Sequence, residues 1–250
     1  MSFNIGVLIG IGVGPGDPEL ITLKGLRRLQ KAPIVCCPSG KAGAIGYAEQ
    51  VVAGYIDRSR QKLIPLAFPM SRDQEKLQAA WQEAGEKVAE YLQQGLDVAF
   101  LTEGDPLFFS TFIYMAEAVQ ERLPAGKVEI VPGVTSISGC TAAAGIPLAV
   151  AGESVVILDA PHRINDLVEI LTLHPVVVLM KVSGCLEDIV EILKQCNWLE
   201  CATLVERCGT DRQRVIVGKD LIGCVRPHYL STLLIRRQER LKSRVGEGSG

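Results

Sequence analysis

A turn dense in glycine and proline, close to the start of the chain, restricts the fold more than any other feature of the sequence. Residues 6–12 form an apolar run typical of a buried strand, and residues 23–31 have the pattern of a helix. The turn between them therefore follows the carboxyl end of a strand, where open α/β sheets bind their ligands. Residues 102–106 and 131–136 form two more turns of this kind. We expect the three turns to build one ligand site.

Strand and helix patterns alternate through the first half of the chain, which predicts a parallel sheet with helices on its faces. The predicted strands cover residues 7–11, 34–37, 62–66, 98–102 and 128–131, and the helices cover 23–31, 44–53, 72–94, 111–123 and 135–144. The second half has strands at 154–158, 176–180, 202–206, 214–218 and 232–236 and helices at 164–173 and 185–195. The fold class is therefore α/β, with a mostly parallel N-terminal sheet and a mixed C-terminal sheet. We place the domains at residues 1–148 and 149–238, followed by a basic, disordered tail at 239–250.

The composition is that of a soluble chain long enough for two domains, since 48% of its 250 residues are hydrophobic, 22% are charged and the net charge is −2. The basic segment 236–244 has no basic stripe with interleaved aromatics to accompany it, which argues against nucleic acid as a partner. The uncharged stretch 130–152 contains proline, glycine and hydroxyl residues, so we expect it in a packed core and not in a membrane. The eight cysteines form no CxxC pair and no zinc-like spacing, and no secretory signal opens the chain. They predict reduced thiols in a cytoplasmic protein without a metal site.

Two common nucleotide-binding motifs do not occur at the first turn. A Rossmann site needs G-x-G-x-x-G, but the registers that start at Gly10, Gly12 and Gly14 all lack the third glycine. The second strand leads into Pro38 without the acidic residue that binds a ribose. The chain also has no P-loop sequence. The turns instead carry carboxylates, which repel phosphate and suit a cation. These are Asp17, Glu19, Glu103 and Asp105.

The second and third turns each leave two interpretations open. Asp105 has the position of a helix N-cap or of a ligand-binding carboxylate. Glu103 lies beside Gly104, which permits close approach of a ligand, and its charge could balance a positive one. In the third turn, Thr135 and Ser136 either cap the small-residue helix that follows or hold a ligand with their hydroxyls.

Taken together, the three turns resemble a known family. The sequences GVGPGDP at 12–18, EGDP at 103–106 and VPGVTS at 131–136 are similar, in order and spacing, to those of the tetrapyrrole methylases. These are S-adenosylmethionine-dependent enzymes of cobalamin and sirohaem synthesis. The resemblance runs from about residue 6 to residue 236, and residues 102–111, 179–182 and 205–209 look most like the subgroup that methylates carbon 20 of precorrin-2. Pro38 stands where the uroporphyrinogen methylases carry an aspartate, which disfavours that subgroup.

This resemblance implies two α/β domains with a cleft between them, in a homodimer. It also implies S-adenosylmethionine in that cleft as methyl donor, with S-adenosylhomocysteine as product. The residues that match the family's cofactor contacts are Pro15, Glu103, Gly104, Asp105, Phe108, Thr135, Ser136, Met180 and Gly209. From the sequence alone, Met180 is equally well explained as a core residue at the end of a strand.

The implied reaction is methyl transfer to the electron-rich C20 of precorrin-2 in cobalamin (vitamin B12) biosynthesis. This small-molecule tetrapyrrole carries many carboxylates, so cationic residues near strand ends are candidates for substrate binding. They are Arg72, Arg163, Lys181 and Arg207. A proton must leave the product carbon, and Glu103 is a candidate catalytic base by location, although cofactor contact is its favoured role. His162 is the histidine best placed for the cleft.

Two other functions stay open. The first is methylation of cobalt-factor II, or of another ring position, by an enzyme of the same family. The second is a non-catalytic tetrapyrrole carrier. The intact turns at 103–106 and 132–136 disfavour the carrier, because a carrier does not need a methyl donor.

Overall fold

The computed structural model describes residues 5–40, 44–69, 71, 73–224 and 226–237. Arg72 and the tail at 239–250, both singled out in the sequence, lie outside the described residues. The chain divides into two compact units, Met1–Thr135 and Ser136–Gly250. Each unit has its own sheet and its own core. Within the described ranges, no helix is long and apolar enough to cross a membrane.

The first unit is built on a five-stranded parallel sheet with the order β3-β2-β4-β1-β5. Its strands are β1 (Val7–Gly12), β2 (Ile34–Ser39), β3 (Lys62–Ala67), β4 (Val98–Thr102) and β5 (Lys127–Val131). Its helices are α1 (Leu23–Lys31), α2 (Tyr47–Val52), α3 (Gln74–Gln93) and α4 (Phe112–Arg122), with short 3-10 helices η1 (Pro18–Leu20) and η2 (Ala53–Tyr55). Every neighbouring pair of strands runs parallel, which confirms the sheet predicted from the alternating pattern.

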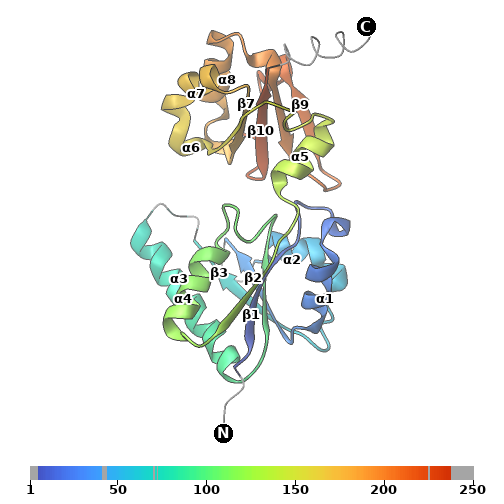
Figure 1. Cartoon of the computed structure of the whole chain (residues 1–250), viewed down its shortest axis with the longest axis vertical. Helices are drawn as coiled ribbons and strands as arrows, with labels where there is room; N and C mark the ends of the chain where they lie inside the picture. Colours follow the sequence, from blue (N-terminus) through green and yellow to red (C-terminus); the bar gives the residue numbers. More distant parts are fainter. Residues whose placement is uncertain (1–4, 41–43, 70, 72, 225, 238–250) are drawn as a thin grey trace. The chain divides into compact units, whose positions relative to one another are not determined.

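The central strand β4 shows why an uninterrupted apolar run forms this sheet. Val98 and Phe100 point to one face, whereas Ala99 and Leu101 point to the other, and all four are fully buried. Side chains alternate across a strand, so a strand covered on both faces needs apolar residues at every position. Helices α3 and α4 cover the face of Phe100, and α1 and α2 cover the opposite face (Figure 1).

The second unit contains a mixed five-stranded sheet with the order β6-β7-β10-β8-β9. Its strands are β6 (Val155–Asp159), β7 (Val176–Met180), β8 (Ala202–Glu206), β9 (Arg214–Val217) and β10 (Ser231–Arg236). Its helices are α5 (Ser136–Ala144), α6 (Ala160–Arg163), α7 (Leu167–Leu173) and α8 (Leu186–Gln195), with 3-10 helices η3 (Ile164–Asp166), η4 (Val182–Gly184), η5 (Leu199–Cys201) and η6 (Gly218–Leu221). Strand β6 runs parallel to β7, whereas β10 runs antiparallel to β7 and β8, so the predicted mixed sheet is confirmed.

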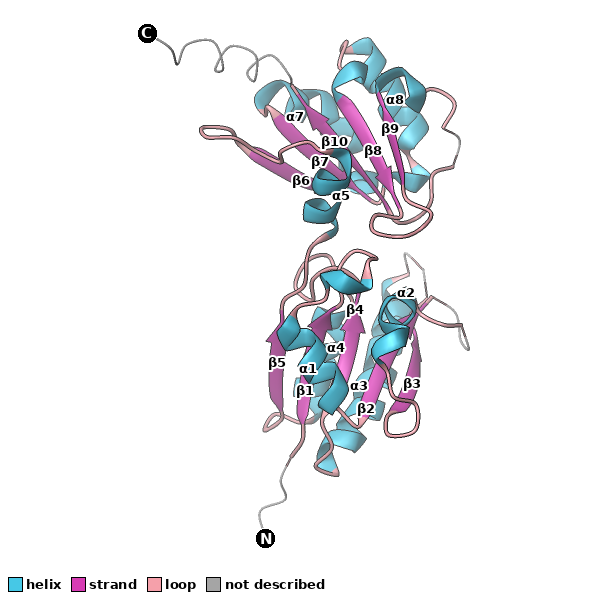
Figure 2. Cartoon of the chain, turned by 90° about the vertical axis from the view of Figure 1, so that its right-hand side faces the viewer, coloured by secondary structure: helices cyan, strands magenta, loops and turns pink. Residues whose placement is uncertain are grey.

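Helices cover both faces of this second sheet. Leu171 of α7 and Ile189 of α8 belong to one core, together with Leu204 of β8. The next residue of β8, Val205, points to the other face and packs with Cys140 of α5. Figure 2 shows α5 lying across the sheet on this second face.

The boundary between the units lies between Thr135 and Ser136, earlier than the boundary at residue 148 expected from the sequence. The difference arises because α5 packs on β8 and β10 and so belongs to the second unit. The sequence placed this helix with the strand that precedes it, since every earlier helix covers the sheet from which it emerges.

A buried ion pair fastens the segment after α5 to the second sheet. The Arg236 guanidinium lies 2.7 Å from the Glu153 carboxylate, and the two side chains are only 4% and 3% exposed. Its Nη1 also donates to the carbonyl oxygens of Pro147 and Leu148, at 3.1 and 3.0 Å. These bonds give the carbonyl groups of Pro147 and Leu148 hydrogen-bond partners on β10.

Candidate active site

The first and second turns pair with each other at the ends of β1 and β4. The backbone N–H of Gly104 donates to the carbonyl of Gly14 at 2.9 Å, and the Gly14 N–H donates back to the Gly104 carbonyl at 3.4 Å. The N–H of Val13 donates to the carbonyl of Thr102 at 2.9 Å. Gly14 and Gly104 have φ values of 86° and 65°, in the left-handed region that favours glycine. The buried Pro15 follows directly in this paired turn.

The third turn packs against the other two through glycine backbones. A Cβ atom on Gly12 would lie 2.5 Å from the Gly104 carbonyl oxygen, and one on Gly133 would overlap the same oxygen. Only residues without a side chain allow the three backbones to come this close. We call residues 12–16, 102–106 and 131–135 the triple-turn assembly.

Asp105 joins the second turn to the third. Its Oδ1 accepts a hydrogen bond from the N–H of Leu107 at 2.9 Å, and its Oδ2 accepts one from the N–H of Gly133 at 3.0 Å. Helix α4 begins only at Phe112, so Asp105 is not its N-cap and Pro106 is not in its first turn. Of the two interpretations left open by the sequence, helix capping is therefore wrong. The carboxylate organises the assembly.

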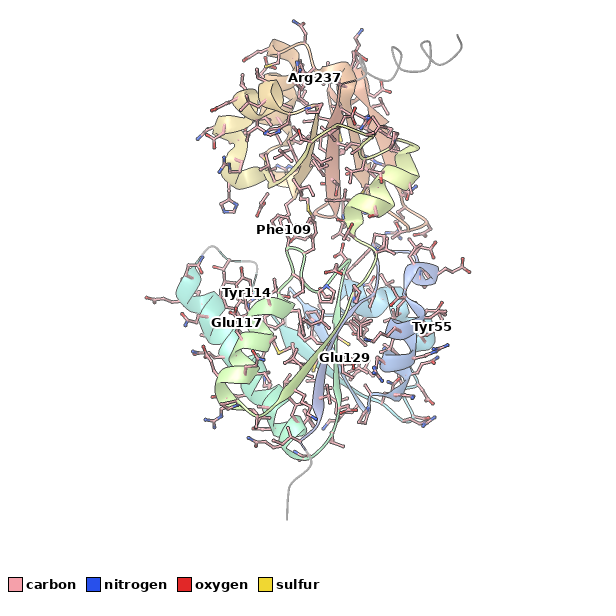
Figure 3. All side chains as sticks on the ribbon, in the orientation of Figure 1. Tyr55, Phe109, Tyr114, Glu117, Glu129 and Arg237 are labelled. Atoms are coloured by element: carbon pink, nitrogen blue, oxygen red, sulfur yellow. The ribbon has the colours of Figure 1, made fainter. Side chains whose placement is uncertain are left out.

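The loop that leads from the second turn to α4 is closed at its base by two hydroxyls. Thr102 Oγ1 and Ser110 Oγ lie 2.7 Å apart, and Ser110 Oγ also accepts from the N–H of Phe112 at 3.1 Å. The rings of Phe108 and Phe109 meet edge to face, with centroids 4.9 Å apart. Phe109, labelled in Figure 3, has a φ of 51°, which is rare for an aromatic residue. Neither this closure nor the left-handed backbone of Phe109 has a local signal in the sequence.

Glu103 is the group of the assembly whose protonation is most altered by its surroundings. Its side chain is half-buried, and within the described part of the chain its carboxylate has no hydrogen-bond or ion-pair partner. Burial raises the pKa of Glu103 to about 7. A buried carboxylate with no internal partner favours either a proton or an external positive charge.

Four of the site residues predicted in the second unit lie along one edge of its sheet. Strands β7 and β8 both run antiparallel to β10, and β6 runs parallel to β7, so these three strands end at the same edge. Met180 ends β7, and Lys181 follows it. Arg207 and Gly209 follow the end of β8, with only β10 between the two groups. We call these four residues, together with Asp159 at the end of β6, the second-unit edge.

Lys181 meets two other ionisable residues at this edge. Its Nζ lies 3.4 Å from Asp159 Oδ2, and Nδ1 of His162 lies 3.4 Å from the same oxygen. The other carboxylate oxygen, Oδ1, is buried and has no hydrogen-bond partner among the described residues. Lys181 and Arg207 have φ values of 58° and 48°, and such strained backbone is enriched at functional sites. No pattern in the sequence marks Asp159 as a site residue.

Glu206 holds the turn that follows β8. Its carboxylate is 4% exposed and accepts hydrogen bonds from Nε of Arg214 at 2.6 Å and from the N–H of His228 at 2.7 Å. The N–H of Arg207 donates to the carbonyl of Leu230 at 2.8 Å. The turn is thus fixed from both of its sides, which positions the Arg207 backbone.

The other two cationic residues predicted to bind substrate, Arg163 and Arg72, are not among the residues of the second-unit edge. Arg163 lies in α6 and pairs with Asp166 at 3.1 Å, with half of its side chain exposed. Arg72 is outside the described residues. Thr135 and Ser136 end the third turn, and Ser136 is the first residue of α5. Among the described residues, no cluster of His, Cys, Asp and Glu could hold a metal ion.

The sequence of this chain matches that of a known protein family. The family model for the Tetrapyrrole (Corrin/Porphyrin) Methylases matches residues 7–219. The chain belongs to this family. The matched range includes the whole triple-turn assembly and the whole second-unit edge, so both are parts of a tetrapyrrole methylase domain pair.

Several members of the family are similar over most of their length. The cobalt-precorrin-2 C(20)-methyltransferase of Salmonella typhimurium is 31% identical over 93% of this chain and 97% of its own. The probable cobalt-precorrin-2 C(20)-methyltransferase of Methanocaldococcus jannaschii is 34% identical over 92% and 96%. The precorrin-2 C(20)-methyltransferase of a Sinorhizobium species is 34% identical over 82% and 84%.

Solved structures of other tetrapyrrole methylases share the fold. A cobalt precorrin-4 methyltransferase superimposes with a TM-score of 0.70 at 23% identity, covering 92% of this chain and 94% of that one. The uroporphyrin-III C-methyl transferase of Thermus thermophilus, complexed with S-adenosylhomocysteine, gives 0.62 at 21% identity, covering 93% and 98%. At these identities the likeness establishes the architecture.

Proposed function

We propose that this protein transfers a methyl group from S-adenosylmethionine to C20 of precorrin-2 in cobalamin biosynthesis. The observation that carries the proposal is the triple-turn assembly, in which the carboxylate of Glu103 has no partner among the described residues. It is supported by relatives named for C20 methylation that match nearly the whole chain. The proposed setting is a cytoplasmic homodimer.

The residues present fit S-adenosylmethionine, which supplies an electrophilic methyl group on a positively charged sulfur when it is bound. Glu103 is a half-buried carboxylate that pairs with no other described residue, so it matches an external cation. The close glycine backbones leave no room for side chains within the assembly. Its carboxylates also disfavour phosphate ligands.

The residues of the assembly shape the proposed donor site in two ways. Asp105 orients the second and third turns toward each other, and Gly104 presents its backbone in the left-handed conformation. The proposed donor contacts are Pro15, Glu103, Gly104, Asp105, Phe108, Thr135, Ser136, Met180 and Gly209. Holding both reactants in line can lower the barrier by as much as about 7–11 kcal/mol. Positioning is therefore the main contribution expected from the protein.

The proton that leaves C20 after methyl transfer needs an acceptor. Because the pKa of Glu103 is raised to about 7, its carboxylate exchanges a proton readily near neutral pH. Substrate carboxylates are proposed to bind Lys181 and Arg207 at the second-unit edge, with Arg163 and Arg72 as further candidates. Cation–carboxylate hydrogen bonds are among the strong ones.

A second candidate substrate is the cobalt-loaded form of the same macrocycle. The relatives from Salmonella typhimurium and Methanocaldococcus jannaschii carry names that specify cobalt-precorrin-2, whereas the Sinorhizobium relative is named for precorrin-2. The two macrocycles have the same outline, so the fold by itself favours neither.

A side-by-side turnover assay tests the proposal. The full chain and S-adenosylmethionine are incubated with metal-free precorrin-2 in one reaction and with cobalt-factor II in another, and products are read by mass spectrometry. A gain of one methyl group at C20 in either reaction supports C20 methylation, and a gain in only one identifies the substrate. Binding of S-adenosylhomocysteine without methylation of either macrocycle would overturn the C20 assignment.

A further inference from the structure

Two cysteines that are far apart in the sequence meet on the face of the second sheet covered by α5. Cys140 lies in the second turn of α5, and Cys208 follows β8. They pack with Val205 in a small cluster, and their exposed fractions are 4% and 7%. Nothing in the proposed methyl transfer uses either thiol.

The two thiols interact directly. A hydrogen bond with Cys140 lowers the pKa of the Cys208 thiol below its ordinary value, against the opposing effect of burial. Burial alone acts on Cys36 and raises the pKa of its thiol to about 12. Since the thiolate is the nucleophile in sulfur chemistry, the lowered pKa favours Cys208 over Cys36 as the attacking thiol.

The position of the pair links two parts of the proposed donor site. Cys140 lies one turn along the helix that begins at Ser136, and Cys208 stands between Arg207 and Gly209. Arg207 and Gly209 both have positive φ values, 48° and 77°, so the turn around Cys208 is tight. A covalent bond between the two sulfurs would therefore constrain Ser136 at the start of α5 and also Gly209 in the turn after β8. Both are proposed contacts of the methyl donor.

We propose that Cys140 and Cys208 form a reversible disulfide that ties α5 to the turn after β8 and weakens binding of the methyl donor. The effect on binding rests on the proposed function, whereas formation of the disulfide does not. Sulfur atoms in a disulfide lie about 2.05 Å apart, closer than two hydrogen-bonded thiols. Closing the bond therefore draws the turn of Arg207 and Gly209 toward α5.

The oxidation is balanced with a peroxide as oxidant. The Cys208 thiolate attacks one oxygen of hydrogen peroxide, the O–O bond breaks, and Cys208 becomes a sulfenic acid while hydroxide leaves and takes up a proton. The Cys140 sulfur then attacks the sulfenic sulfur, the S–S bond forms, and the thiol proton departs with the hydroxyl as water. Two thiols and one peroxide thus give one disulfide and two waters. A dithiol reductant reverses the result by thiol–disulfide exchange.

The first test is chemical mapping of the full chain. The protein is treated with hydrogen peroxide, remaining thiols are alkylated, and the digest is analysed by mass spectrometry. We expect a peptide pair joined through Cys140 and Cys208, two hydrogens lighter than the reduced pair, while the other cysteines are alkylated. Cys208→Ser should abolish the linked pair, and Cys196→Ser, a change at a half-buried cysteine of another helix end, should leave it. Absence of the linked pair from folded, oxidised protein overturns the proposal.

The second test measures binding of S-adenosylhomocysteine to reduced and oxidised protein by calorimetry. We expect oxidation to raise the Kd at least fivefold and dithiothreitol to restore it, in the original chain and in Cys196→Ser but not in Cys208→Ser. If Cys208→Ser does not fold, Cys140→Ser replaces it. A linked pair with unchanged affinity overturns the regulatory role. If the reduced protein does not bind S-adenosylhomocysteine at all, the proposed function fails, and the linked peptide still decides whether the disulfide exists.

Discussion

The carboxylate of Asp105 accepts a hydrogen bond from the backbone of Gly133, a residue of a different turn, at 3.0 Å. Its second oxygen is occupied by the N–H of Leu107 in its own turn. One side chain thus sets the distance between two of the three turns that we assign to the methyl donor.

Replacing Asp105 with asparagine should weaken the link between the turns. The amide can still accept from Leu107, but its NH₂ group faces the N–H of Gly133, and two donors repel. A backbone donor that loses its partner costs about 1–3 kcal/mol. We expect S-adenosylhomocysteine to bind about tenfold more weakly in calorimetry. Asp17→Asn is the matched control: among the described residues the Asp17 carboxylate accepts one hydrogen bond, from the N–H of Glu19 in its own turn, so this variant should bind within twofold of the original chain.

Gly133→Ala should disturb the assembly by steric overlap. The added methyl would collide with the carbonyl oxygen of Gly104, and this backbone atom cannot move without breaking the pairing to Gly14. We expect a loss of roughly 1–3 kcal/mol in unfolding free energy, together with weaker donor binding. Gly54→Ala meets nothing within 4 Å and should leave the thermal midpoint nearly unchanged. Equal midpoints for the two variants would show that the turns are not packed as described.

Glu103→Gln should weaken binding of the positively charged donor more than binding of its neutral product. If the carboxylate balances the sulfonium, the variant loses about tenfold in affinity for S-adenosylmethionine and much less for the neutral thioether S-adenosylhomocysteine. Affinity of the original chain for S-adenosylmethionine should also rise as pH increases through 7, where Glu103 becomes ionised. Parallel losses for the two ligands would argue against the electrostatic role.

The same variant should alter the pH dependence of stability. The folded pKa of Glu103 is about 7 and the ordinary value is 4.5, so the folded state binds the extra proton between these pH values. Its stability therefore falls as pH rises from about 4.5 to 7, and the full penalty remains above 7. Thermal melting without ligand should show Glu103→Gln to be more stable than the original chain at pH 8 and nearly equal at pH 4.5.

Phe109 allows backbone strain to be separated from loss of the ring. Ala and Gly both remove the aromatic contact with Phe108, but only Gly adopts a φ of 51° without a steric cost. After allowing for the greater freedom of Gly in the unfolded chain, Phe109→Gly should be more stable than Phe109→Ala by up to about 1 kcal/mol. Chemical denaturation of both variants measures this difference. A clearly less stable glycine variant would mean that the left-handed conformation is absent.

Glu153→Gln should be strongly destabilising, because it leaves the buried charge of Arg236 unbalanced. Breaking a buried pair by removing one partner costs about 3–5 kcal/mol. The control is Glu83→Gln, which breaks the exposed pair with Lys87 at 2.6 Å and should cost less than about 1 kcal/mol. Denaturant titration compares the two variants. A small effect of Glu153→Gln would show that water reaches the pair.

The sequence predicts the fold well where local patterns carry the information. The apolar run 98–101 predicts a strand buried on both faces of a sheet, and the flanking turns mark where strands end. The boundary between the units was not predictable in this way, because α5 is built of uncharged, mostly small residues whose pattern does not indicate which sheet it covers. Its actual partner depends on contacts with Val205 and Cys208, which are distant in sequence.

The site could be predicted at the level of motifs but not of individual bonds. The density of glycine in the three turns indicated that their backbones approach one another closely. The resemblance to the tetrapyrrole methylases indicated S-adenosylmethionine as the ligand. The two-sided role of Asp105 depends on a partner 28 residues away, and that of Asp159 depends on a neighbouring strand. Left-handed backbone is typical of Gly or Asn, so its presence at Phe109, Lys181 and Arg207 has no local signal.

The order of strands in the first sheet also sets the order in which this sheet can be assembled on the ribosome. Strand β1 is made first, yet its two neighbours are β4 and β5, which end at Thr102 and Val131. A nascent chain therefore carries an exposed apolar strand, and a first turn without partners, until most of the first unit has left the exit tunnel. Long-range parallel pairing is slow and prone to aggregation. We therefore expect truncation before residue 131 to yield insoluble chains, because β1 would lack its partner β5.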